Sequence, residues 1–141
     1  MNTTLANELS ADGPVVFYDG DCGLCDWLVK FLIKHDKTRR LRYATLQGET
    51  ATQLMGVPQG PSGSWSVKLL DERGLHDAST AAIRSIAHAG GIGKLAIVLL
   101  LVPRPIREAV YRWIARNRYR WFGTVDTCIV PTPALRQRFL P

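Results

Sequence analysis

Two cysteines separated by two residues are the clearest chemical feature of the chain. The stretch VVFYDGDCGLCDWLVKF, residues 15–31, carries Cys22 and Cys25, and Asp19 and Asp21 come just before them. Two thiols at this spacing can cycle between dithiol and disulfide, supply half of a four-ligand zinc site, or pack as small buried side chains. The elements that position the two thiols help to decide among these three possibilities.

The cysteines are predicted to lie between a β-strand and a helix. Residues 15–18 form a continuous apolar run of β-formers, which is typical of a strand covered on both faces. Apolar residues then recur at helical spacing from 24 to 32, which predicts an amphipathic helix ending near residue 36. Residues 41–46 predict a second strand, so we expect a βαβ unit with two parallel strands.

The remaining pattern completes an α/β domain. It predicts a short helix over 49–55, a strand near 65–69, a tight turn at 71–74, a returning strand at 75–78 and a helix to residue 88. The order β-α-β-α-β-β-α predicts a mixed sheet with helices on its faces, followed by additional C-terminal helices. We expect residues 1–13 to be a flexible N-terminal arm and residues 14–141 to be a single domain.

The apolar segment IGKLAIVLLLV, residues 92–102, is the stretch to consider as a possible membrane-spanning helix. It has 11 residues and is followed by Pro103 and Pro105. A spanning helix needs about 20 apolar residues. We therefore expect a core or partner-facing helix here and no stable membrane insertion.

The position of Cys22 favours a redox interpretation. At the start of a helix, backbone N–H groups without intrahelical partners stabilise a thiolate, so we expect Cys22 to be the attacking nucleophile. Cys25, one turn later, is placed to resolve a mixed disulfide. Asp19 and Asp21 oppose ionisation of the nearby thiol, and either could accept a proton from Cys25, so we expect them to tune the pair. This chemistry needs no bound cofactor.

A basic helix is predicted after Pro105. Residues 104–120 contain six arginines and one glutamate, and contribute most of the formal net charge of +6. Within this helix an apolar set at helical spacing predicts a core-facing stripe: Ile106, Ala109, Val110, Trp113 and Ile114. A solvated basic face is then the simplest interpretation. The preferred functional alternative is that Arg116, Arg118 or Arg120 helps to hold an acidic partner or the motif aspartates. Nucleic-acid binding is disfavoured, because the stripe assigns Trp113 and its apolar neighbours to packing in the core, where they are not available to stack on bases.

One alternative stays open. The chain could be a non-catalytic basic adaptor that binds nucleic acid or an acidic protein, with structural or zinc-bound cysteines. Zinc would require Cys128 together with His76 or His88, although neither histidine has ligand spacing with another. Three cysteines and no visible secretory signal indicate a reducing cytoplasm.

Two separated motifs resemble one protein family. YDGDCGLC, with Asp19, Cys22 and Cys25 in a D-x-x-C-x-x-C arrangement, is similar to the motif of the DCC family of thiol-disulfide oxidoreductases. The stretch ARNRYRWFG, residues 115–123, resembles the C-terminal signature of the same family. The resemblance covers about residues 14 to 140. It implies a thioredoxin-like fold and exchange with a thiol or disulfide substrate such as a protein.

Overall fold

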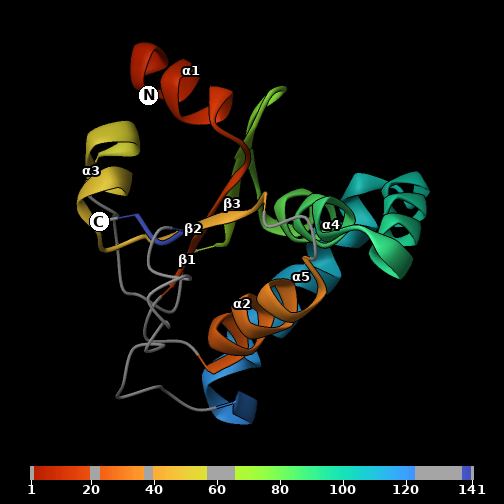
Figure 1. The fold of residues 1–141 in the computed structure, drawn as a ribbon. Coiled ribbons are helices and arrows are strands. Elements are labelled where there is room, and N and C mark those ends of the chain that lie inside the picture. Colours follow the sequence, from red (N-terminus) through yellow and green to blue (C-terminus); the bar gives the residue numbers. More distant parts are fainter. Residues whose placement is uncertain (1, 20–22, 37–39, 57–65, 123–137, 141) are drawn as a thin grey trace.

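The computed structural model describes residues 2–19, 23–36, 40–56, 66–122 and 138–140, with the backbone alone for residues 23, 24, 91–93, 118, 119 and 122. From the first strand onward the predicted order β-α-β-α-β-β-α with added C-terminal helices is confirmed, and the α/β arrangement is consistent with a thioredoxin-like fold (Figure 1). The elements are α1 (Thr3–Ala11), β1 (Val15–Tyr18), α2 (Gly23–His35), β2 (Arg42–Thr45), α3 (Glu49–Met55), β3 (Lys68–Asp71), β4 (Gly74–Asp77), α4 (Ala78–Ala89), the 3₁₀ helix η2 (Gly91–Leu101) and α5 (Arg104–Phe122).

The four strands form one mixed sheet in the order β2-β1-β3-β4. Strand β1 pairs in parallel with β2, as the predicted βαβ unit requires, and antiparallel with β3. Strands β3 and β4 form a hairpin in which Asp71 lies opposite Gly74. Gly74 has a φ of +114°, a backbone conformation that glycine adopts without the steric cost that a side chain would add.

Strand β1 is buried on both faces, which explains its continuous apolar sequence. Val16 and Tyr18 belong to the hydrophobic cluster that includes residues of α2 and α4. Val15 and Phe17 point to the opposite side, into the cluster that includes residues of α1 and α3. Figure 1 shows these two layers of helices on either side of the sheet.

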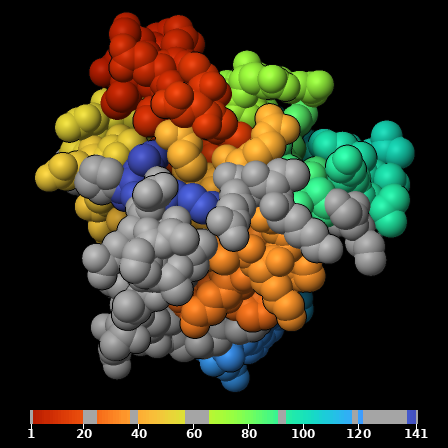
Figure 2. All heavy atoms as spheres, in the orientation of Figure 1, coloured from red at the N-terminus to blue at the C-terminus, as the bar shows by residue number. Residues whose placement is uncertain are grey.

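Helix α1 occupies the place where the sequence predicts a flexible arm. The Asn2 side chain accepts a hydrogen bond from the Leu5 backbone N–H and so caps the helix. Ala6 is buried, and Leu5 and Leu9 pack against the cluster on the α3 side. The space-filling view shows α1 (red) beside α3 (yellow) at one end of the molecule (Figure 2). This helix was not predicted, because the apolar stripe of TTLANELSA is sparse and its partners lie far along the chain.

Residues 138–140 extend the sheet at its β2 edge. Phe139 forms a parallel bridge with Tyr43, and the Tyr43 N–H donates to the Arg138 carbonyl at 2.8 Å. The Arg138 guanidinium donates to the Asp36 carboxylate at 2.6 Å, and both side chains are almost completely buried. The end of the described chain is thereby fixed to the residue that follows α2.

The two elements after α4 correct the sequence prediction. Segment η2 is a 3₁₀ helix whose described apolar side chains are largely exposed. The expectation of a core helix was therefore wrong, and of the two alternatives only a partner-facing helix remains. In α5, Ile106, Val110 and Trp113 are more than half exposed, so the predicted core-facing stripe was also wrong apart from Ile114. The face that packs on the domain instead carries Tyr111. Over the part of the chain that the structure describes, a helix with the length and hydropathy to cross a bilayer is not found.

Candidate functional site

Cys25 lies in the first turn of α2, close behind the end of β1. Its side chain is 6% exposed and belongs to the hydrophobic cluster between α2 and the sheet. The start of a helix carries the positive end of its dipole, and a positive potential favours a thiolate over a thiol. Asp26 follows Cys25 in the same turn and pairs with Lys30 at 2.8 Å. Asp26 is thus a carboxylate close to the cysteine motif that the sequence reasoning did not single out.

Asp19 is buried at the end of β1. It is 1% exposed, and its Oδ1 accepts a hydrogen bond from the Gln47 Nε2 at 3.0 Å. Gln47 lies shortly after the end of β2, and the carboxyl ends of two adjacent parallel strands meet at the same edge of a sheet. The parallel pairing of β1 and β2 therefore brings the side chains of Asp19 and Gln47 together at the carboxyl ends of these strands. The cysteine motif follows β1 at the same end.

An apolar pocket of about 220 Å³ lies beside the Cys25 thiol. It is lined by residues of α2, α4 and α5 and by the residue before β3: Cys25, Trp27, Leu28, Val67, Ala82, Tyr111, Ile114 and Ala115. The lining is almost wholly apolar. A cavity of this kind can enclose an aromatic or branched aliphatic group, because burying such a group removes apolar surface from water.

Tyr111 fixes α5 to the sheet at this pocket. Its hydroxyl accepts a hydrogen bond from the Val67 N–H at 3.1 Å, just before β3 begins. The Val67 carbonyl accepts one from the Ala78 N–H at 3.0 Å. Both backbone groups of Val67 are therefore engaged within the protein. The predicted core-facing stripe of this helix included Ile114 but not Tyr111 or Ala115, because most of the stripe lies on another side of the helix.

The structure describes some of the predicted site residues and not others. Cys25 and Asp19 are both buried, Cys25 in the first turn of α2 and Asp19 directly after β1, whereas Cys22, Asp21 and Cys128 lie outside the described residues. Of the arginines proposed for an acidic partner, Arg116 and Arg120 are exposed, and the side chain of Arg118 lies outside the described part.

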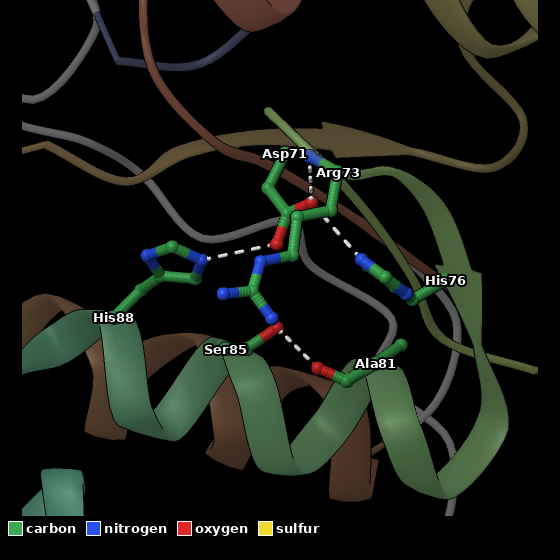
Figure 3. A network of polar contacts seen from close by, with 6 residues as sticks. All are labelled: Asp71, Arg73, His76, Ala81, Ser85 and His88. Carbon is green, nitrogen blue, oxygen red and sulfur yellow. Dashed lines mark hydrogen bonds and ion pairs between the residues drawn. The ribbon is translucent and has the colours of Figure 1, made fainter. Parts of the chain in front are cut away.

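The two histidines considered as zinc ligands instead contact one carboxylate. Figure 3 shows Asp71 between His76 and His88. His76 Nε2 lies 2.9 Å from Asp71 Oδ1, and His88 Nε2 lies 3.2 Å from Asp71 Oδ2. Burial opposes ionisation of Asp71, but hydrogen bonds from His88, the Arg73 N–H and His76 outweigh it and lower the pKa of this carboxyl below its ordinary value. Among the described residues, no group of three or more His, Cys, Asp or Glu side chains is arranged to hold a metal ion.

Comparison with known proteins points to one family. The sequence profile of the family described as DCC1-like thiol-disulfide oxidoreductase matches residues 16–124, a span that includes both cysteines of the motif and all of α5. The match therefore covers both the YDGDCGLC motif and the ARNRYRWFG stretch, residues 115–123.

Two relatives support the same family. The chain is 37% identical over 128 residues to the uncharacterized protein YuxK of Bacillus subtilis (strain 168), covering 90% of this chain and 93% of the relative. It is 32% identical over 117 residues to the DCC family protein At1g52590, chloroplastic, of Arabidopsis thaliana, covering 82% of this chain and 68% of the relative. No solved structure gave a significant match.

Proposed function

Because the chain belongs to the DCC1-like thiol-disulfide oxidoreductase family, we propose that it is an enzyme that exchanges a Cys22–Cys25 dithiol or disulfide with a protein or small thiol substrate. The observation that carries the proposal is the position of Cys25. Cys25 lies in the first turn of the helix that follows the central strand, and it is one of the residues that line an apolar pocket. This is where a resolving thiol is expected if Cys22 attacks from the helix start.

In the reducing direction, exchange proceeds in two steps. The Cys22 thiolate attacks a substrate disulfide, a Cys22–substrate disulfide forms, and the first substrate sulfur leaves as a thiolate that takes up a proton. Cys25 then loses its proton and attacks Cys22, which releases the second substrate thiol and leaves a Cys22–Cys25 disulfide. The substrate gains two electrons and the enzyme loses two. The oxidising direction is the reverse of these steps.

Asp19 is proposed as the proton acceptor for Cys25. Asp19 is a buried carboxylate held by a hydrogen bond from Gln47, and it lies where the chain leaves β1 for the cysteine motif. Asp21 is proposed to tune the pair through its charge. Replacing Asp19 with Asn would remove the base while keeping the shape of the side chain, so the second step should slow more than the first.

The pocket beside Cys25 is proposed to take an apolar group of the substrate. Its lining offers almost no polar surface to a charged thiol such as glutathione. A peptide with an aromatic or branched aliphatic residue next to its cysteine would bury that side chain against Trp27, Ala115 and Ile114. The proposal therefore favours apolar disulfides over charged ones.

Trapping with single cysteine variants tests the proposed roles. Cys25→Ser removes the resolving thiol and should accumulate mixed disulfides through Cys22, whereas Cys22→Ser should accumulate far fewer. Native alkylation of the wild type should label Cys22 much faster than Cys25, which is buried. Equal trapping by both variants, or two cysteines that resist alkylation in the native state, would contradict the proposed function.

A further inference from the structure

Nearly all of the exposed bulky apolar side chains are on two consecutive elements. Among the described residues ten large hydrophobic side chains are exposed, and every one except Trp27 is on η2 or α5. They are Leu95, Ile97, Val98, Leu99 and Leu101 on η2, and Ile106, Val110, Trp113 and Trp121 on α5. We refer to these nine residues as the apolar surface. Exposed apolar side chains gathered on two consecutive elements in this way make these elements a candidate interaction site.

On α5 the apolar surface follows one side of the helix, with Asn117 as its one polar interruption. At 100° per residue, Ile106, Val110, Trp113 and Trp121 fall within an arc of about 80°. Trp113 and Trp121 contact each other edge to face, with ring centroids 5.0 Å apart. The stripe is separate from the face that carries Tyr111 and lines the pocket, so packing of the helix on the domain leaves it uncovered. Segment η2 packs on α4, and Figure 1 shows it (teal) on the side away from the sheet.

A row of arginines runs beside this stripe. Arg112, Arg116 and Arg120 recur every four residues along α5, and all three are exposed. Glu108 is the sole acidic residue of the helix and accepts a hydrogen bond from the Ser79 hydroxyl of α4, so its charge faces the domain. The outward side of α5 therefore combines tryptophans and aliphatic side chains with positive charge.

We propose that the apolar surface and its arginine row bind the face of an anionic lipid bilayer. Tryptophan and aliphatic groups insert at the boundary between headgroups and acyl chains, while arginines reach the lipid phosphates. A second copy of the chain fits this surface poorly, because self-association would bring two arginine rows together. The apolar segment of η2 has 11 residues, which is too short to span a bilayer, so binding is peripheral.

Vesicle sedimentation of the 141-residue chain tests this proposal. Vesicles of phosphatidylcholine with about one third phosphatidylglycerol should bind the protein, and vesicles of phosphatidylcholine alone should bind it far more weakly. Each basic residue near an anionic surface strengthens binding by roughly fivefold, so Arg112→Gln/Arg116→Gln/Arg120→Gln should weaken it on the order of a hundredfold. Raising the salt concentration should weaken wild-type binding as well.

Two further variants separate the lipid surface from other causes. Lys34→Gln/Arg40→Gln/Arg73→Gln removes the same charge from exposed positions on other elements and should bind nearly as the wild type does. Leu101→Ser/Trp113→Ser keeps every charge and should lose binding because the inserted groups are gone.

The proposal is overturned if the protein does not sediment with anionic vesicles at low salt or if both charge variants lose binding equally. It is also overturned if the wild type is a dimer that Leu101→Ser/Trp113→Ser dissociates. Vesicle binding requires neither cysteine, so its outcome is independent of the exchange reaction. Preferential binding to an oligonucleotide or an acidic protein, lost in the α5 triple variant while vesicles stay unbound, would likewise overturn it.

Discussion

The buried ion pair between Asp36 and Arg138 allows a quantitative prediction. Asp36 Oδ2 accepts hydrogen bonds from Arg138 Nη2 at 2.6 Å and from the Leu41 N–H at 2.9 Å. The two paired side chains are 0% and 10% exposed. Replacing Asp36 with Asn keeps an acceptor for Leu41 but leaves the guanidinium as a buried charge without its counter-charge. We expect the free energy of unfolding to fall by about 3 kcal/mol, the lower end for breaking a buried pair.

Urea denaturation measures this loss. With a denaturant slope of about 2 kcal/mol per molar, a loss of about 3 kcal/mol moves the unfolding midpoint down by about 1.5 M. Asp26→Asn is the matched control, because its ion pair with Lys30 has a similar length of 2.8 Å but the lysine is 63% exposed. A surface pair of this kind contributes about 0.5 kcal/mol or less, so the control midpoint should move by about 0.2 M.

A second substitution separates the charge from the packing. Adding Arg138→Met to Asp36→Asn removes the uncompensated charge and should recover part of the lost stability. The reasoning would be refuted if Asp36→Asn moved the midpoint no further than Asp26→Asn does. It would also be refuted if the double variant were less stable than Asp36→Asn alone.

Three further predictions concern the hairpin and the pocket. The lowered pKa of Asp71 means that its carboxylate stabilises the fold above its ordinary pKa of about 3.9, and that this contribution is lost as the pH falls through the folded value. Asp71→Asn should therefore be less stable than the wild type at pH 6, and the difference in their free energies of unfolding should narrow on acidification below about pH 4. A difference that widens there would contradict a lowered pKa of Asp71. Tyr111→Phe leaves the Val67 N–H without its acceptor and should cost about 1–3 kcal/mol in urea unfolding, with faster hydrogen exchange of the Val67 amide; unchanged exchange would argue against the contact. Ala115→Leu fills the pocket beside Cys25 and should lower kcat/KM for an aromatic disulfide more than for oxidised glutathione; an equal loss for both would argue against a substrate pocket.

The sequence predicted best those elements whose pattern is local. The continuous apolar run predicts β1 and the helical spacing of apolar residues predicts α2, and together they locate Cys25 at a helix start. The contacts that complete the site join residues far apart in the chain. Gln47 reaches Asp19 across 28 positions, and Tyr111 reaches Val67 across 44. No local pattern marks such pairs, because strand pairing and helix docking bring them together.

The packed face of α5 shows a second limit. Ile106, Val110 and Trp113 form a good apolar stripe by spacing, so periodicity alone assigns them to the core. The face that packs on the domain instead carries Tyr111 and Glu108, and of the predicted stripe it includes only Ile114. A helix with two faces able to pack gives an ambiguous pattern, and tertiary contacts decide which one is buried. The face left outside is the one proposed to bind lipid.

A redox titration of the Cys22–Cys25 couple tests the central proposal most directly. The Cys128→Ser variant leaves only these two cysteines of the three in the chain, so any dithiol–disulfide transition within one molecule belongs to them. Equilibration with thiol buffers followed by alkylation and mass spectrometry should show one reversible two-electron transition, with a tenfold change in the ratio of oxidised to reduced protein for each 30 mV or so. Cysteines that stay reduced across the range, or that oxidise only between molecules, would contradict the proposed exchange.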